Sequence, residues 1–477
     1  MGAEHQHLSN ADAAWLHMDR PTNLMVINSV LVFDEQLDWE RLTEIVRTRM
    51  VERYPRFHQR VVEGRLTLRG AHWEEDPDFG MQRHMHRRGL AAPAGEAALK
   101  ELAGDLASIP LDRGKPLWDM YLIDGPGSGC AVIVRMHHCI ADGIALARVM
   151  LSLTDPAPTT GGSAPPPPPV PRQRSGLRAV VGAPLAATRR VAHTLTQEGL
   201  ETLAHPRHAF ELADAFAAAA QSLAKLLFTP DDADSVLRGN LGATLSVAWS
   251  KPLSLKEINR VAHAQGATVN DVLLAAVSGA LRGHLIAGGE QPHEIRTFVP
   301  FNLRPLDRPV PRELGNHFGL VFLTLPVDRS SRRERLRELK RRMDEIKHSP
   351  EGPLSFAMLE AIGLTPPEVE SRIVDIFSAK ATAVMTNVPG PRETVYLAGV
   401  PMRAVLVWAP TSGSVGMSVS IFSYHGEVTV GLLVHSELVP NPESIVDGIQ
   451  RELAALARLA PEASTAVRPK RRVTNSA

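Results

Sequence analysis

A run rich in proline and glycine, DPAPTTGGSAPPPPPVPRQRSG, interrupts the chain at residues 155–176. Proline fixes one backbone torsion and lacks an amide proton, and glycine weakens regular structure, so neither a helix nor a strand can pass through this run. We expect an extended, exposed linker here. The 477-residue chain therefore has at least two folded parts, which agrees with the domain count that its length favours.

The sequence pattern predicts four segments. They are a first domain over residues 1–154, a connector over 155–239, a second domain over 240–462 and a basic tail over 463–477. After the proline-rich run, the connector continues as an Ala-rich amphipathic helical pair, Leu177–Leu227, whose apolar stripe fits either a partner helix or a lipid surface. In both domains, apolar strand-like runs alternate with helical segments, and this alternation predicts an α/β architecture.

Composition and charge exclude several classes of protein. Hydrophobic residues make up 44% of the chain and charged residues 22%, which is ordinary for a globular protein. Lys+Arg and Asp+Glu both number 52, so the zero net charge argues against a nucleic-acid partner. No stretch reaches the ~20 apolar residues of a membrane span, and the first residues lack the pattern of a secretory signal. We expect a cytoplasmic protein with at most peripheral membrane contact.

The most informative residues are HHCIADG at positions 137–143. An apolar strand-like run precedes them and an apolar helical segment follows. Adjacent histidines at the end of a buried strand point to opposite faces, so at most one of His137 and His138 faces a given cavity. Asp142 lies near the helix start, where the helix dipole favours a carboxylate. Gly143 permits a sharp turn or a close backbone approach.

Three interpretations of this run are open on the residues alone. It can be a packed histidine pair with a capping aspartate. It can belong to a metal site, although no third and fourth ligand stands at a recognisable spacing. It can supply a general base, because an unperturbed histidine pKa near ~6.5 suits proton abstraction at neutral pH. No GxSxG sequence accompanies it, and Cys139 has no cationic neighbour in sequence, so direct attack is favoured over a covalent intermediate.

HHCIADG resembles the HHxxxDG motif of the CoA-dependent acyltransferase superfamily. Further segments, in the same order and spacing, resemble the bacterial wax ester synthase/acyl-CoA:diacylglycerol acyltransferase family, and the resemblance spans nearly the whole chain. These segments are the opening SNADAAWLHMD, Pro116-Leu117-Trp118, Asn270-Asp271, Gly315-Asn316, and Asn387-Val388-Pro389-Gly390-Pro391.

The resemblance implies two chloramphenicol acetyltransferase-like α/β domains with an active-site tunnel between them. It implies an acyl-CoA-dependent O-acyltransferase that transfers a long-chain acyl group to diacylglycerol, giving triacylglycerol, or to a long-chain alcohol, giving a wax ester. No cofactor and no metal are implied, and the lipid acceptor suggests association with a membrane or lipid droplet. Two alternatives are a different hydroxyl acceptor or carrier-protein donor, and a catalytically silent relative that binds lipid or acyl-CoA.

The resemblance also implies roles for the histidine run. His138 is similar to the catalytic base, which takes the proton of the acceptor hydroxyl. By the same resemblance, His137 supports the site, and Asp142 is a structural carboxylate that pairs with an arginine. The segment RYPRFHQRV offers Arg56 and Arg60 as that partner.

The remaining segments fall in the substrate-binding region by the same resemblance. Asn270 is expected to hold the substrate carbonyl or the developing oxyanion, and Asp271 to fix its loop, although helix capping after Thr268 alone explains both residues. Pro116, Leu117 and Trp118 are expected to support the site, or simply to belong to the core. The Asn387–Pro391 segment is either a rigid turn or a lip of the acyl tunnel.

Overall fold

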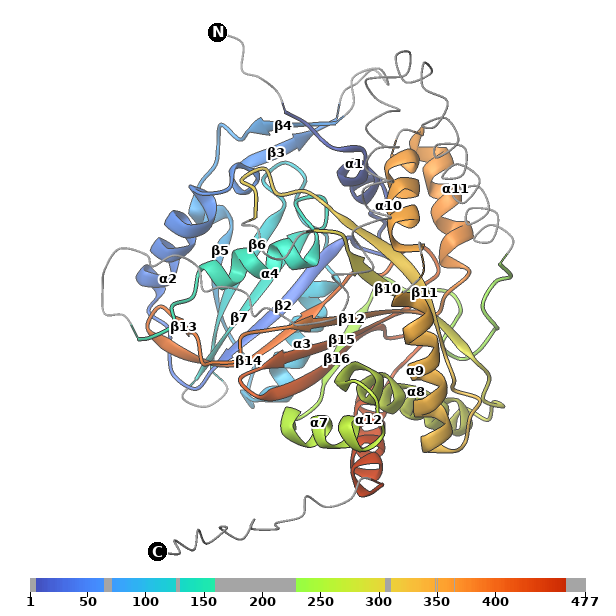
Figure 1. Ribbon diagram of the computed structural model, residues 1–477. Helices are drawn as coiled ribbons and strands as arrows, with labels where there is room; N and C mark the ends of the chain where they lie inside the picture. The colour runs from blue at the N-terminus through green and yellow to red at the C-terminus, as the bar shows by residue number, and fades with distance from the viewer. Residues whose placement is uncertain are drawn as a thin grey trace, which may run out of the picture.

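The structure, a computed structural model, describes residues 6–63, 71–125, 129–158, 229–304, 310–347, 349, 351–363 and 365–459. Most of the expected linker, the helical pair over 177–227 and the tail over 463–477 lie outside the described residues. Two large mixed sheets occupy the centre of the molecule and helices pack around them (Figure 1), so the α/β class expected from the sequence is confirmed.

The first sheet has six strands in the order β13-β14-β2-β7-β6-β5. The pair β5–β6 is parallel and the other pairs are antiparallel. Its central strands β2 and β7 are buried along their whole length, as expected for continuous apolar runs. The strands are β2 (Val26–Phe33), β5 (Met85–Gly89), β6 (Trp118–Asp124), β7 (Cys130–His137), β13 (Tyr396–Leu397) and β14 (Val400–Trp408).

The second sheet has the order β11-β10-β12-β15-β16-β8, with β9 pairing to β16. The helices α7 (Leu255–Ala264), α8 (Val269–Ala287), α9 (Arg332–Lys347) and α12 (Pro442–Arg458) pack against it and bury one large apolar core (Figure 1). The strands are β8 (Leu245–Trp249), β9 (Leu253–Ser254), β10 (Ile295–Asn302), β11 (Phe318–Leu325), β12 (Ala383–Pro389), β15 (Met417–Tyr424) and β16 (Glu427–His435).

The remaining elements surround the first sheet and the junction between the two sheets. A small sheet has the order β1-β4-β3, and a π-helical turn (Arg47–Val51) and two 3-10 turns (Pro55–Phe57, Met81–Arg83) connect neighbouring elements. The strands are β1 (Gln6–His7), β3 (Gln59–Val62) and β4 (His72–Glu75). The helices are α1 (Asn10–His17), α2 (Trp39–Val46), α3 (Glu96–Ala107), α4 (Gly143–Ser152), α10 (Glu351–Ile362) and α11 (Pro367–Ser378).

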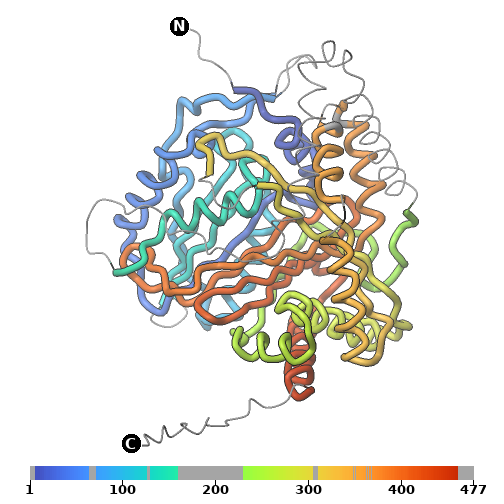
Figure 2. The backbone as a smooth tube through the Cα atoms, in the orientation of Figure 1, coloured from blue at the N-terminus to red at the C-terminus, as the bar shows by residue number. Residues whose placement is uncertain are grey.

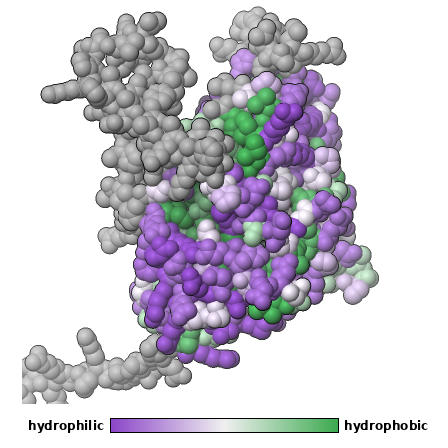
Figure 3. All heavy atoms as spheres, turned by 90° about the vertical axis from the view of Figure 1, so that its right-hand side faces the viewer, coloured by the Kyte–Doolittle hydropathy of each residue, from purple (hydrophilic) through white to green (hydrophobic). Residues whose placement is uncertain are grey.

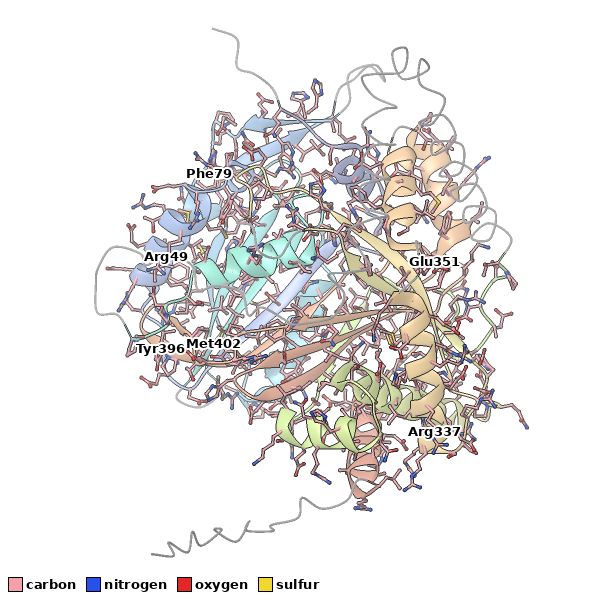
Figure 4. The ribbon with its side chains drawn as sticks, in the orientation of Figure 1. Arg49, Phe79, Arg337, Glu351, Tyr396 and Met402 are labelled. Atoms are coloured by element: carbon pink, nitrogen blue, oxygen red, sulfur yellow. The ribbon has the colours of Figure 1, made fainter. Side chains whose placement is uncertain are left out.

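The two halves of the chain share the first sheet. Strand β14 comes from the C-terminal half and pairs with β2, for example at Val405 opposite Leu31. Two backbone hydrogen bonds of 2.8 Å tie Asp155 to Tyr396, and Arg49 pairs with Asp155 at 2.9 Å. Figures 2 and 4 show the orange-red β13–β14 hairpin reaching the N-terminal part of the molecule, where Arg49 also lies. This pairing of a C-terminal strand with the N-terminal sheet was not expected from the sequence.

His84 is a buried histidine in the first half, apart from the HHCIADG run. Its ring stacks on Trp118 with centroids 4.5 Å apart, and its Nδ1 donates to the Trp118 carbonyl oxygen at 2.8 Å. Burial lowers the pKa of His84 to about 4. A histidine in an unfolded chain titrates near ~6.5, so between these pH values the unfolded state binds the extra proton. His84 therefore destabilises the fold progressively as pH falls through this window.

We predict that His84→Phe makes the stability less dependent on pH. Phenylalanine keeps the stack on Trp118 but cannot take up a proton. The loss in free energy of unfolding between pH 6.5 and pH 4 should shrink by about 3 kcal/mol, because one pKa unit is worth ~1.4 kcal/mol. Urea unfolding at several pH values measures this, and an unchanged loss would show that His84 is not held neutral in the folded state.

Candidate active site

The HHCIADG run lies where the two halves of the chain meet. It ends β7 and starts α4, and the segment that leads into β11 lies against it. The Gly315 N–H donates to the Ile140 carbonyl oxygen at 3.2 Å, and Ala141 and Gly315 form a parallel bridge. Gly315 has a φ of +89°, which favours glycine, and this conformation turns Asn316 toward the histidines. Residues from both halves therefore build the surroundings of the run.

His138 is held by hydrogen bonds on its backbone and on one ring nitrogen. Its N–H donates to the Met25 carbonyl oxygen at 2.7 Å, and its Nδ1 lies 3.0 Å from Oδ1 of Asn316. No hydrogen bond to Nε2 is present among the residues that the structure describes. The residue is only 5% exposed. The second ring nitrogen is therefore the one available to a substrate.

Two aromatic rings cover the His138 imidazole. Trp15 of α1 stacks on it with centroids 4.2 Å apart and planes at 22°, and Phe318 of β11 lies at 5.3 Å. Burial lowers the pKa of His138 to about 4, although the charge of Asp142 acts to raise it. The ring is thus neutral at pH 7, which is the form that accepts a proton. The sequence alone suggested an unperturbed pKa for His138, and burial among aromatic rings explains why the pKa is lower.

An apolar pocket begins at the same two aromatic rings. It encloses about 90 Å³ between α1, β10, β11, α10 and α11. Trp15 and Phe318 are part of its wall and also contact the His138 imidazole, so the pocket and His138 share these two rings. The other residues in its wall are Met18, Phe298, Gly319, Leu320, Phe322, Ser355, Met358, Leu359, Ile362, Val374, Phe377, Ser378 and Ser412.

Asp142 combines a helix cap with an ion pair. Its Oδ1 accepts the Ala145 N–H at 2.8 Å, so Asp142 is the N-cap of α4, as expected from its place before the helix. Its Oδ2 accepts from Arg304 at 3.0 Å and from the His317 N–H at 3.1 Å. Both side chains of the ion pair are buried. Asp142 therefore has the structural role that the resemblance implied.

The prediction that Arg56 or Arg60 pairs with Asp142 is wrong. Arg56 instead pairs with Asp12 at 3.0 Å and donates to the Ile140 carbonyl oxygen at 2.8 Å. Arg60 lies on β3 and pairs with Glu74 at 3.7 Å. The true partner, Arg304, stands 162 positions after Asp142 in the other half, and it becomes a neighbour only when the two halves pack.

His137 points away from His138 and supports the turn. Its Nδ1 accepts the Cys139 N–H at 3.1 Å, and its Nε2 lies 3.8 Å from the Asp19 carboxylate. Burial acts to raise the pKa of Asp19, but contacts with His137, the Met25 N–H and Arg113 outweigh it and the pKa is lowered. The two histidines thus have different partners, Asp19 and the Cys139 N–H for His137, and Asn316 and Trp15 for His138.

Pro116, Leu117 and Trp118 support this strand end from the core. The Leu117 carbonyl oxygen accepts the His137 N–H at 2.9 Å. Trp118 is fully buried, and its Nε1 donates to the Phe57 carbonyl oxygen at 2.9 Å. Leu117 is 2% exposed. These side chains thus hold the histidine run in place and leave no surface for a substrate in this conformation.

Asn270 and Asp271 begin helix α8. Thr268 and Asp271 form a capping box, in which the Asp271 carboxylate accepts the Thr268 N–H at 2.8 Å. Asp271 therefore fixes the loop, as expected. Asn270 Oδ1 accepts from Asn387 at 2.8 Å, which joins two of the segments singled out in the sequence. No hydrogen bond between Asn270 and His138 is present in the described part of the chain, so its oxyanion role stays a prediction.

Gly143 and Cys139 do not contribute chemistry here. A Cβ on Gly143 would meet no atom within 4 Å, so the expected close backbone approach is not observed. Burial raises the pKa of the Cys139 thiol, which keeps it protonated and poorly nucleophilic. Across the described ranges, no group of three or more His, Cys, Asp or Glu side chains could hold a metal ion, and no helix is long and apolar enough to span a membrane.

Four residues around His138 carry no role in the expectations drawn from the sequence. Asp12 and Trp15 lie in the opening segment SNADAAWLHMD, and Asn316 lies in the Gly315-Asn316 segment, so the resemblance marked their positions without showing what they contact. Phe318 follows two residues later. Their contacts with the histidine run depend on packing between distant parts of the chain, which periodicity does not reveal.

We predict that Arg304→Gln destabilises the protein strongly. The change leaves the buried Asp142 carboxylate without its cation, and breaking a buried pair on one side typically costs about 3–5 kcal/mol. The matched control is Arg341→Gln on the exposed face of α9, where Arg341 pairs with Glu338. Denaturant unfolding should show a large shift of midpoint for the first variant and none for the control. Equal unfolding midpoints for Arg304→Gln and Arg341→Gln would mean that the Asp142–Arg304 pair does not hold the two halves together.

Comparison with known proteins identifies the family. The wax ester synthase/diacylglycerol acyltransferase catalytic domain matches residues 8–273, and the C-terminal domain of the same family matches residues 314–457. A putative diacylglycerol O-acyltransferase of Mycobacterium tuberculosis H37Rv is 28% identical over 94% of this chain and 90% of its own length. The probable diacylglycerol O-acyltransferase tgs1 of the same organism is 27% identical over 94% of this chain and 95% of its own length.

Solved structures show the same two-domain fold. The wax ester synthase/diacylglycerol acyltransferase of Marinobacter aquaeolei VT8 has a TM-score of 0.67 at 20% identity, covering 95% of this chain and 99% of that one. The first condensation domain of the calcium-dependent antibiotic synthetase has a TM-score of 0.61 at 15% identity, covering 96% and 97%. The chloramphenicol acetyltransferase-like fold is thus confirmed, and the chain belongs to the wax ester synthase/diacylglycerol acyltransferase family.

Proposed function

We propose that this protein is an acyl-CoA-dependent diacylglycerol O-acyltransferase in which His138 is the general base. The observation that carries the proposal is the state of His138: a neutral imidazole whose Nε2 accepts no hydrogen bond from the described residues, at the junction of the two halves and next to an apolar pocket. The family to which the chain belongs, and the diacylglycerol O-acyltransferase names of its relatives, support the reaction class and the acceptor.

The reaction transfers the acyl group directly from the sulfur of CoA to the oxygen of the acceptor. Nε2 of His138 takes the proton of the acceptor hydroxyl as that oxygen attacks the thioester carbonyl. The tetrahedral intermediate then collapses, the carbon–sulfur bond breaks, and the imidazolium returns its proton to the leaving thiolate. The products are an ester and free CoA, and His138 ends neutral as it began. The chain contributes no covalent intermediate, in agreement with the protonated Cys139 thiol.

The apolar pocket supports a hydrocarbon substrate. Its wall combines aromatic and aliphatic side chains with a few small polar ones. Its volume of about 90 Å³ is below the ~150 Å³ of a cavity that binds benzene, so it takes only a short part of a long chain as it stands. Met358 and Phe377 are part of its wall, and methionine in particular adapts its shape at low cost. Diacylglycerol is the proposed acceptor and a long-chain alcohol the second candidate.

We predict that His138→Ala abolishes ester formation. Positioned general-base catalysis contributes about 10²–10⁴-fold, so product formation should fall by at least ~10²-fold. The assay follows free thiol and radiolabelled ester from palmitoyl-CoA with either diacylglycerol or hexadecanol. His263→Ala, on the exposed surface of α7, is the control and should retain wild-type rates. Full activity of His138→Ala would remove His138 as the base. Wild-type inactivity with both acceptors would favour another acceptor, a carrier-protein donor or a binding role.

The outer face of α11 is the proposed contact with a lipid surface. On its inner side, Val374 and Phe377 belong to the pocket wall. On its outer side, Val369 and Ile376, two turns apart, are 45% and 49% exposed. Figure 3, which faces the side of the molecule that carries α10 and α11, shows apolar residues gathered in its upper part above a mostly hydrophilic region. A lipid acceptor held at this face would lie one helix away from the pocket.

We predict that the double variant Val369→Ser/Ile376→Ser weakens binding to lipid. Serine removes exposed apolar area that would be buried in a lipid surface, which lowers the affinity. Flotation with phosphatidylcholine vesicles that contain diacylglycerol measures the bound fraction. The control is Ile109→Ser/Ile286→Ser, at positions 51% and 52% exposed on other parts of the molecule. Equal loss of binding in both double variants, or in neither, would contradict a specific role of α11.

A further inference from the structure

We propose that Asp12 and Asn316 are positioning residues that fix the tautomer of His138. They hold the proton on Nδ1 and thereby leave the lone pair of Nε2 free for the acceptor hydroxyl. This inference rests on the proposed function, because it concerns how the same base is made ready. Nothing in the family match or in the relatives' names assigns a role to either residue.

The argument starts from the side-chain amide of Asn316. Its Nδ2 donates to Asp12 Oδ1 at 2.7 Å and to the His138 carbonyl oxygen at 2.8 Å. Both partners can only accept, because one is a carboxylate and the other a carbonyl. If the amide were flipped, its oxygen would face two acceptors. The orientation of the Asn316 amide is therefore fixed by its surroundings.

The fixed amide determines where the histidine proton sits. Oδ1 of Asn316 lies 3.0 Å from Nδ1 of His138, and this oxygen can only accept a hydrogen bond. Nδ1 must therefore carry the hydrogen. A neutral imidazole has one N–H, so Nε2 carries the lone pair. The carbonyl oxygen of His138 itself also contacts the ring and favours the same proton position, so Asn316 strengthens a tautomer that it does not set alone.

Asp12 anchors the amide with a buried charge. The residue is fully buried, and its Oδ1 also accepts the Asn316 backbone N–H at 3.0 Å. Its Oδ2 pairs with Arg56 at 3.0 Å, and the Arg56 guanidinium lies over the ring of Trp73 at 4.9 Å. Each carboxylate oxygen thus has defined donors, and the carboxylate cannot rotate without losing one of them. The chain of contacts from Arg56 to His138 is continuous.

The chain of contacts from Arg56 through Asp12 and Asn316 to His138 joins both halves of the protein. Asp12 and His138 belong to the first half, whereas Asn316 belongs to the second. The base therefore receives its tautomer only after the halves have packed. The titratable or charged groups around the imidazole are His137, Cys139 and Asp142 from its own segment, Asp12 from α1, Arg56 from the 3-10 turn and Arg304 from the segment after β10.

The experiment compares Asn316→Ala and Asn316→Asp in the full-length enzyme. Alanine removes the Asn316 acceptor for Nδ1–H, so kcat should fall with the fraction of the competent tautomer, by about 10-fold at most if both tautomers stay populated, while the KM for acyl-CoA should stay within about twofold. Aspartate keeps an oxygen facing Nδ1 and can share one proton with Asp12, so it should recover part of kcat. This rescue also serves as the test if the alanine variant does not fold.

A direct readout of the tautomer separates positioning from a structural role. In protein with ¹⁵N-labelled histidine, the His138 signals, identified by their loss in His138→Gln, should show hydrogen on Nδ1 in the wild type and a mixture of tautomers in Asn316→Ala. The matched control is Asn23→Ala, which removes a buried amide that donates to Thr411 at 3.1 Å and should change neither kcat nor the tautomer.

Two results overturn the proposal. One is an active wild type together with a folded Asn316→Ala variant whose kcat is unchanged. The other is a wild-type spectrum in which hydrogen resides on Nε2. A wild type that is inactive with every acceptor would instead reject the proposed function. The ¹⁵N spectrum would still show whether Asn316 holds the proton on Nδ1 of His138. Loss of stability in Asn316→Ala with unchanged kcat per folded molecule counts as the first result.

Discussion

The buried ion pair between Asp142 and Arg304 is the interaction on which the arrangement of the site depends. It joins the first helix after the histidine run to the segment that enters β11, and both charges are out of water. A buried charge without a partner is costly, so the halves cannot separate or slide here without losing several kcal/mol. Asp142 also caps α4, and Arg304 also donates to the Gly315 carbonyl oxygen at 2.7 Å. One contact thus fixes a helix start and the glycine turn that presents Asn316.

This anchoring permits an apolar environment around the base. Because Trp15 and Phe318 cover the imidazole and burial disfavours its charged form, the ring stays neutral. A base with a pKa of about 4 is weak toward an alcohol in water. In the site, however, proton transfer is coupled to attack on the thioester, and the same apolar surroundings exclude the water that would otherwise hydrolyse it. In the proposed reaction, burial therefore trades basicity for an exclusive reaction with the acceptor.

Local features of the sequence predicted much of this structure. The apolar runs became β2 and β7, Asp142 became a helix cap, and Thr268 with Asp271 became a capping box, because each depends on residues within one or two turns. The failures at the ion pair and in the sheet concern long-range contacts. The partner of Asp142 was sought near position 56 and lies at 304, and β14 pairs with β2 although more than 360 positions separate them. Neither contact has a local signature, since ion pairs and strand pairings between distant segments are decided by packing.

The proline-rich run marks a boundary in sequence but not in function. Strand β14 completes the sheet of the first half, and Asn316 of the second half orients the histidine of the first. A first half on its own would expose the edge of β2 and would leave both Asp12 and Asp142 without partners that come from the second half. The surroundings of His138 and the wall of the adjacent pocket therefore arise together, from packing that involves both halves of the chain. If His138 is the base that we propose, it is competent only when both halves of the chain are folded and packed.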